Sequence, residues 1–261
     1  MTLPLDSWLG LRRLTAARIA QGHAGVSMPT APQLAFQLAH AQARDAVHVA
    51  LDVDALARSL SAPSLLVHSQ AADRQTYLRR PDLGRVLDDA SRAMLASHHG
   101  QFDLCIVLAD GLSAPAIARH AAPLLALLPL ASMRVAPLVI AGQARVALGD
   151  DIAATLGARM VVVLIGERPG LSSPDSMGIY MTWAPRVGLT DERRNCISNV
   201  RPEGLPYAQA VAGLVYLMDG ARRLGTSGVS LKDDRAATGA ASLSPALAFA
   251  AGDAGTLGTG S

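Results

Sequence analysis

Three short apolar runs, separated by stretches with helical spacing, constrain the fold of this chain more than any other feature. The runs are FDLCIVLAD at 102–110, RVAPLVIA at 134–141 and RMVVVLIG at 159–166. The third is unbroken and rich in β-branched residues, which is typical of a strand buried on both faces in a parallel sheet. Helical segments at 115–128 and around 152–156 lie between the runs. This alternation predicts an α/β fold with an open, mostly parallel sheet and helices on both faces.

The chain before this region is predicted to be mainly helical. Apolar residues at helical spacing indicate an amphipathic helix over 6–21 and a second helix over 33–47. A short helix within 51–65 and a strand at 65–68 follow. Residues 72–87 are charged and contain Pro and Gly, which favours surface loops or short helical turns.

Further short strands are expected at 177–185 and 195–199, with a closing helix at 207–224. Beyond these elements the composition is rich in Gly, Ala, Ser and Thr, which cannot bury enough apolar area to offset the entropy of ordering. The sequence therefore predicts a helical N-terminal region (1–98), a sheet domain (99–231) and a largely disordered tail (232–261).

Composition argues against two classes of partner. The formal net charge is +2 and only 3% of residues are aromatic, whereas nucleic-acid binders combine a cationic face with aromatic stacking platforms. The most apolar stretch, 121–141, contains three prolines and Arg134, and its charge-free part is shorter than the ~20 residues that a bilayer requires. We therefore expect no nucleic-acid partner and no membrane span.

The cysteines and the known motifs exclude several kinds of site. Cys105 and Cys196 are too few for a disulfide framework and do not match zinc spacing, which predicts reduced thiols in a cytosolic protein. The N-terminus lacks the apolar segment of a secretory signal. Motifs for dinucleotide or nucleoside triphosphate binding, for a hydrolase nucleophile and for common metal sites are also missing, so no metal site is expected.

The loop after the third apolar run is the strongest candidate for a binding site. Ligands of open parallel sheets bind beyond the carboxyl ends of the strands, and there Glu167 and Arg168 follow directly on an apolar strand. A carboxylate in this position needs hydrogen-bond donors. Glu167 either pairs with Arg168 or a neighbouring amide and ties the loop, or it accepts hydrogen bonds from a ligand.

The remaining candidate residues each have a plain structural interpretation. His40, Asp45 and His48 can share a helix face, where a solvated or capping pair is favoured over a ligand set. Cys196 lies in a short apolar strand, where a small buried hydrophobe is the default and ligand contact is the alternative. The helix at 6–21 either packs on its own domain or docks on a partner.

Five longer segments together carry a resemblance to one family. They are LTAARIAQGHAGVSMPT at 14–30, FQLAHAQARDAVH at 36–48, LVIAGQARVALGD at 138–150, VLIGERPGLSSPDS at 163–176 and NCISNVRPEG at 195–204. In these segments the chain resembles the small (light) subunit of ethanolamine ammonia-lyase, an adenosylcobalamin-dependent enzyme. The resemblance spans about residues 7–232, and the Gly- and Ala-rich end has no counterpart in it.

The resemblance implies a Rossmann-like domain in a cytoplasmic hetero-oligomer with a large TIM-barrel subunit. It implies that base-on adenosylcobalamin lies between the two subunits and that the large subunit holds the substrate, ethanolamine. A radical mechanism then gives acetaldehyde and ammonia. The family's cobalamin contacts fall on Val146, Glu167 and Cys196, and no catalytic acid or base is expected in this chain. Whether a bacterial microcompartment encloses the enzyme stays open.

Two other functions stay open beside this one. The chain is alternatively a free-standing α/β protein that binds or converts a small molecule, with its strand-end loops forming a complete site. A third alternative, which is compatible with the first function, is an assembly adaptor whose N-terminal helix targets a protein shell.

Overall fold

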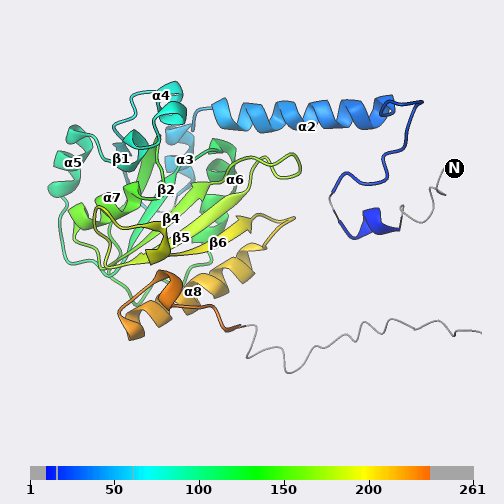
Figure 1. Ribbon diagram of the computed structural model, residues 1–261. Helices are drawn as coiled ribbons and strands as arrows, with labels where there is room; N and C mark the ends of the chain where they lie inside the picture. Colours follow the sequence, from blue (N-terminus) through cyan, green and yellow to red (C-terminus); the bar gives the residue numbers. More distant parts are fainter. Residues whose placement is uncertain (1–9, 16, 61, 236–261) are drawn as a thin grey trace, which may run out of the picture.

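A six-stranded sheet forms the centre of the computed structural model, which describes residues 10–15, 17–60 and 62–235 (Figure 1). The strand order is β1-β3-β2-β4-β5-β6. The first four of these strands are parallel, and β5 and β6 are added antiparallel. This arrangement confirms the predicted open, mostly parallel α/β sheet. The strands are β1 (Ser64–His68), β2 (Cys105–Ala109), β3 (Leu138–Gly142), β4 (Met160–Gly166), β5 (Met177–Trp183) and β6 (Arg194–Val200).

Two separate cores lie on the two faces of the sheet, because successive side chains of a strand point to opposite sides. One face is covered by α6 (Ala114–Leu125) and α8 (Tyr207–Leu224), and α3 (Val53–Ser59) packs against α6. The other face is covered by α5 (Asp89–Ala96) and α7 (Leu148–Leu156). On this second face α7 contacts β2 and β4, whereas Cys196 and Ser198 of β6 are exposed.

The strands at 105–109 and 138–142 begin three or four residues later than the apolar runs predict. Pro137 has no N–H to donate to a strand ladder, and β3 begins at the next residue. Upstream of β2 and β3, single bridges Phe102↔Ala158 and Leu104↔Val135 replace a continuous ladder.

The described residues before 99 contribute one strand and several helices. The strand predicted at 65–68 is confirmed as β1, which pairs with β3 in the same sheet as the later strands. The helix predicted at 33–47 is confirmed as α2 (Thr30–His48), and the charged stretch 72–87 holds two short turns, α4 (Arg74–Arg79) and η2 (Leu83–Arg85). The division of the chain at residue 98 stays an interpretation of the sequence.

The prediction of a helix over 6–21 is wrong for the part of that stretch that the structure describes. It contains only the 3-10 turn η1 (Leu11–Arg13), in which no residue is buried. Leu14 is 82% exposed, so no packed apolar face stabilises a helix here, and short isolated helices are marginal in water. Residues 1–9 and 236–261, including most of the predicted disordered tail, lie outside the described residues.

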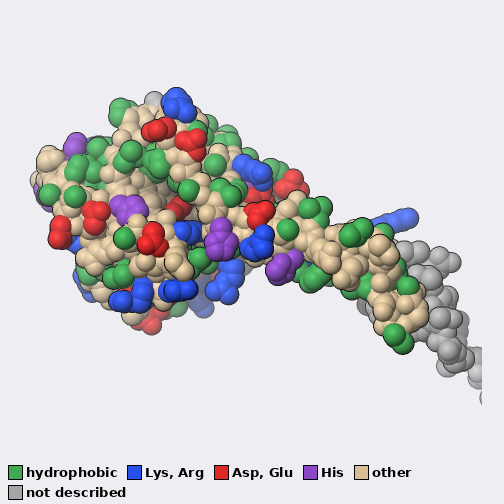
Figure 2. All heavy atoms as spheres, turned by 90° about the horizontal axis from the view of Figure 1, so that it is seen from above, with side chains coloured by type: hydrophobic (Ala, Val, Ile, Leu, Met, Phe, Trp, Pro, Cys, Tyr) green, Lys and Arg blue, Asp and Glu red, His purple; other side chains and the backbone are tan. Residues whose placement is uncertain are grey.

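Helix α2 projects away from the body of the molecule, as Figures 1 and 2 both show. Leu34 and Leu38 on this helix are 58% and 60% exposed, and only Ala39 and Ala46 are buried. A helix with this much exposed apolar surface is typical of an element that packs against another molecule.

Candidate functional site

The carboxyl ends of β2, β3 and β4 surround a hollow of about 410 Å³. Open parallel sheets bind ligands at this end, which is where the sequence placed the candidate site. Three strand-end loops and α4 supply the lining, together with Tyr180 of β5. The lining residues are Tyr77, Gly111, Leu112, Arg145, Val146, Ile165, Gly166, Glu167, Arg168 and Tyr180.

Two glycines let the loops after β2 and β4 approach each other closely at the floor of this hollow. Gly111 has a φ of +57°, and a Cβ there would lie 2.3 Å from the carbonyl oxygen of Gly166. A Cβ on Gly166 would in turn lie 2.1 Å from the carbonyl oxygen of Ser113. Only glycine fits either position, and the backbone contact Leu112 N–H to Gly166 O (2.9 Å) holds the two loops together.

The loop after β3, which carries Val146, is fixed by the Asp110 carboxylate. Asp110 follows β2 directly and accepts the backbone N–H groups of Gln143 and Ala144, each at 2.9 Å. Burial raises the pKa of Asp110, while these N–H donors and the Arg74 guanidinium oppose the rise. The Tyr77 hydroxyl donates to the carbonyl of Ala144 at 3.0 Å. The loop is therefore held in one conformation before any ligand arrives.

Glu167 lies at the end of β4, and its carboxylate forms hydrogen bonds that connect neighbouring loops. Its carboxylate accepts from the Ser176 hydroxyl and from the backbone N–H of Asn199, with 3.2 Å between that nitrogen and Oε2. Among the described residues it forms no ion pair, with Arg168 or with any other cation. Because an ionised carboxylate offers about four acceptor positions, Glu167 retains capacity to accept from a ligand as well.

Cys196 is exposed, so the prediction that it is a small buried hydrophobic residue is wrong. It lies opposite Tyr180 in the β5–β6 pair, and its Sγ is 3.3 Å from the Ser198 hydroxyl oxygen. Residues 180, 196 and 198 share the sheet face that α7 leaves uncovered. Burial raises the pKa of Tyr180, with a further contribution from a hydrogen bond to Cys196. We call these three side chains, Tyr180, Cys196 and Ser198, the open face.

The structure brings the three predicted residues to one surface. Val146 and Glu167 line the same hollow as Tyr180, the cross-strand partner of Cys196. Two lining residues, Tyr77 and Arg145, are not among the residues that the sequence predicts. For Tyr77 the reason is that the charged stretch 72–87 favours a surface loop, although Tyr77 is fully buried. A single aromatic residue within a charged stretch is the only sequence signal that could have pointed to Tyr77.

The other candidates remain apart from this hollow. His40, Asp45 and His48 lie on the projecting helix α2, and Asp45 forms an exposed ion pair with Arg44 (3.8 Å). Across the parts of the chain that the structure describes, no group of three or more His, Cys, Asp or Glu side chains is placed to hold a metal ion. Within the same residues, no helix has the length and apolar character needed to cross a membrane.

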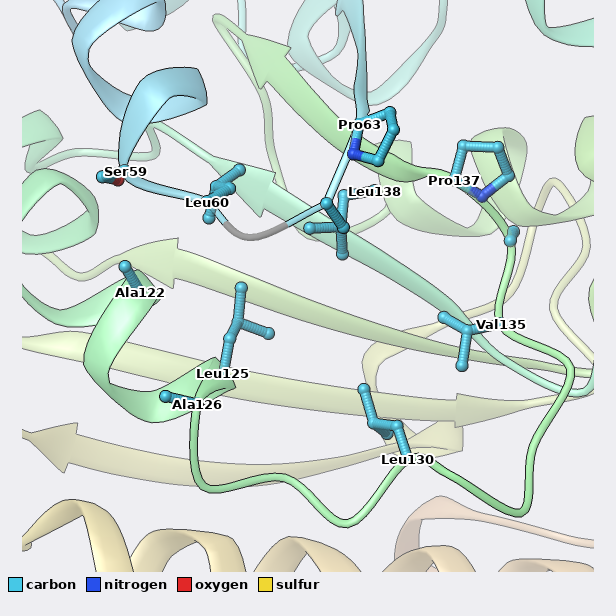
Figure 3. Close-up of a pocket in the computed structure, with 12 residues that line it drawn as sticks. Ser59, Leu60, Pro63, Ala122, Leu125, Ala126, Leu130, Val135, Pro137 and Leu138 are labelled. Carbon is cyan, nitrogen blue, oxygen red and sulfur yellow. The ribbon is translucent and has the colours of Figure 1, made fainter.

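A second hollow, of about 590 Å³, lies at the amino ends of β1 and β3, at the opposite edge of the sheet (Figure 3). Leu60, Leu125, Leu130 and Leu138 point into it, and none of its lining residues is charged. Although larger, it offers no acid, base or charged group, so the hollow at the carboxyl ends is the better candidate for polar recognition.

Comparisons with a family model and with individual known proteins point to the same family. Residues 5–232 match the model of the family described as "Ethanolamine ammonia-lyase light chain (EutC)". Proteins called ethanolamine ammonia-lyase small subunit are similar over most of both chains. That of Ralstonia nicotianae is 58% identical over 89% of this chain and 90% of its own. Those of Pseudomonas aeruginosa and Azotobacter vinelandii are 57% and 58% identical over 88% of this chain, covering 88% and 89% of their own. The chain therefore belongs to the ethanolamine ammonia-lyase light-chain family.

Proposed function

We propose that this chain forms one side of the adenosylcobalamin site of ethanolamine ammonia-lyase and that the large subunit forms the other. Family membership makes the chain a small subunit of a lyase that converts ethanolamine to acetaldehyde and ammonia. The observation that carries the proposal for the site is that the hollow lined by Val146 and Glu167 adjoins the open face, to which Cys196 belongs.

The residues at this surface suit a corrinoid chemically. A corrin ring is broad and nearly flat, with amide groups around its edge, and the open face is a stretch of sheet without a covering helix. The hollow beside it offers an acceptor in Glu167 and a donor in Arg145. Amide groups both donate and accept, so these side chains can serve them from the rim while apolar atoms contact the ring.

The size of the hollow supports a shared site. At about 410 Å³ it is near the lower end of the range for pockets that enclose a drug-sized ligand, roughly 300–1,000 Å³. A cobalamin is far larger than such a ligand. This chain would therefore contact only part of the cofactor, and a second protein surface would have to cover the rest.

The roles we assign to this chain are binding and orientation. Glu167 accepts hydrogen bonds from amide groups at the corrin edge, while Val146 and Cys196 shape the surface against which the cofactor lies. Adenosylcobalamin, proposed to bind base-on, would supply the radical chemistry. No residue of this chain acts as a catalytic acid or base, and ethanolamine is held by the TIM-barrel large subunit.

The projecting helix α2 supports a second contact with that subunit. Its exposed leucines at positions 34 and 38 would be buried on a hetero-oligomeric partner, which would also orient the open face toward the barrel. We place the complex in the cytoplasm, and a microcompartment shell would be a further enclosure around it.

Mixing experiments test this function against the free-standing alternative. The chain, the large subunit and their mixture are each incubated with adenosylcobalamin and ethanolamine, and acetaldehyde release is followed. Activity is expected only in the mixture. Acetaldehyde release by this chain alone would contradict the proposal and favour a complete site within the strand-end loops.

A further inference from the structure

The Arg145 guanidinium is held in place by a buried aromatic ring. Its carbon Cζ lies 4.2 Å from the centroid of the Tyr77 ring, and Nη2 donates to the Tyr77 carbonyl oxygen at 3.2 Å. The backbone N–H of Arg145 donates to the carbonyl of Gly84 at 2.8 Å. Since Tyr77 and Gly84 are both buried, the side chain and the backbone of Arg145 are each held by a buried residue.

This positioned cation has no carboxylate partner among the described residues. Arg92 pairs with Asp151 at 2.6 Å and Arg194 pairs with Asp150, whereas no described carboxylate oxygen lies within 4.0 Å of the Arg145 guanidinium. Its Nε is buried without a hydrogen-bond partner. Leaving a partly buried guanidinium incompletely paired costs free energy, and an acceptor brought by a ligand would offset that cost.

The charges around the hollow favour an anionic acceptor. Arg145 and Arg168 line it without ion-pair partners in the described chain, and Glu167 is the one carboxylate in the lining. The lining thus carries two positive charges and one negative charge. A guanidinium presents a planar fork of donors that matches the oxygens of a phosphate group in a bidentate manner.

We infer that Arg145 recognises the phosphodiester of the cobalamin nucleotide loop, an inference that rests on the proposed function. Among the groups around a base-on cobalamin the peripheral amides are neutral, and the phosphodiester is the anionic one. Arg145 is adjacent in sequence to Val146, in the loop that Asp110 and Tyr77 hold. The loop therefore offers an apolar contact and a phosphate contact side by side.

The test compares two ligands that differ in the nucleotide loop. Adenosylcobalamin and adenosylcobinamide, which lacks the loop and its phosphodiester, are titrated into the complex of this chain with the large subunit. Binding is measured by calorimetry, with displacement of adenosylcobalamin for the weaker ligand. In Arg145→Met the affinity for adenosylcobalamin is expected to fall roughly ten- to a hundredfold, the range for a charge-assisted hydrogen bond. The affinity for adenosylcobinamide is expected to stay within about twofold.

Two further variants serve as controls. Arg168→Met removes the same charge from the same hollow, but from an exposed side chain, and should change the affinity for either ligand by no more than about twofold. Arg145→Lys keeps the charge and loses the fork, so its affinity for adenosylcobalamin should lie between those of the wild type and Arg145→Met. Thermal unfolding of the free chains checks that each variant folds.

The outcomes separate this inference from the proposed function. An Arg145→Met complex that loses affinity equally for both ligands, or for neither, would overturn the phosphodiester assignment while leaving the shared site intact. A loss of affinity in Arg168→Met that matches the loss in Arg145→Met would also overturn it, because the effect would then be general charge attraction. A wild-type complex that binds neither corrinoid would overturn the proposed function and this inference together.

Discussion

Tyr180 and Cys196 are cross-strand partners in the antiparallel β5–β6 pair, on the side of the sheet opposite to α8. Because α8 covers only the other side of these strands, Cys196 is exposed although it lies in the main sheet of the molecule. The same sheet therefore has a closed half, filled by helices, and an open half that is available to a ligand or a second protein.

The two cysteines should react very differently with a thiol reagent. Cys196 is exposed, whereas Cys105 is fully buried in β2 and burial raises its pKa to about 12. Reactive thiols are ionised and accessible, so we expect one labelled site per chain, located at Cys196 by peptide mass spectrometry. Cys196→Ser should abolish the labelling.

The same label reports on the occupied site. If the corrinoid lies against the open face, labelling of Cys196 should slow at least about tenfold in the complex with the large subunit and adenosylcobalamin, relative to the free chain. Labelling that proceeds at the same rate in the free chain and in the loaded complex would show that Cys196 remains in solvent.

Glu167 gives a test of the hydrogen bonds that the cofactor is expected to receive. Glu167→Ala should weaken binding of adenosylcobalamin to the complex by roughly tenfold or more, since charge-assisted hydrogen bonds contribute about 1.5–3 kcal/mol. Glu167→Gln keeps a side-chain acceptor for the N–H of Asn199 and the Ser176 hydroxyl. This variant therefore separates the effect of losing the hydrogen bonds within the loop from the effect of losing the charged contact with the ligand. An affinity that is unchanged in Glu167→Ala by titration would refute the assignment.

Gly111, at the floor of the hollow, should not tolerate a side chain. Gly111→Ala would place a Cβ 2.3 Å from the carbonyl oxygen of Gly166, at a φ of +57°. Gly188 is a matched control, because its φ is +92° and no atom lies within 4 Å of a Cβ there. We expect Gly111→Ala to lower the free energy of unfolding by about 1–3 kcal/mol more than Gly188→Ala does, because the added methyl group would overpack the closely packed loops. Urea denaturation of the two variants measures the difference.

His120 should make the stability of the chain fall on mild acidification. Burial lowers the pKa of His120, opposed by Asp175 and Glu203 and assisted by Arg119. The unfolded state therefore takes up the proton first, and stability is lost as pH falls from near 7 through the ordinary pKa of histidine. Unfolding measured between pH 7.5 and pH 5, in roughly half-unit steps, should show this loss in the wild type.

His120→Gln removes the titrating group and is the control for that pH dependence. Glutamine retains a polar group toward the Tyr207 hydroxyl, which lies 2.7 Å from His120 Nδ1. The difference in unfolding free energy between the wild type and His120→Gln should narrow toward acid pH. A difference that is constant over the whole range would show that His120 does not titrate in this window.

The central strands of the fold could be predicted because each is a run of contiguous apolar residues, a pattern that indicates burial on both faces. An unbroken apolar run such as 160–166 has few alternatives to a strand covered on both faces, and Glu167 is conspicuous because it follows that run directly. These local signals point to the carboxyl ends of the strands, where the structure has the hollow that Glu167 and Val146 line.

The remaining parts of the site depend on packing between distant segments, which no local pattern shows. Tyr77 lies in a charged stretch, yet it contacts the loop after β3 from a position 67 residues earlier in the chain. Val146 looks like core packing from its neighbours alone. The exposure of Cys196 depends on which face α8 covers, and that is set by the whole topology rather than by the strand itself.

A structure of the complex between this chain, the large subunit and adenosylcobalamin, determined by cryo-electron microscopy, tests the central claim most directly. We expect density for the corrin ring against the open face, with its edge beside Glu167 and Val146 and its other side covered by the large subunit. Corrin density held wholly within the large subunit, or at another surface of this chain, would contradict the account.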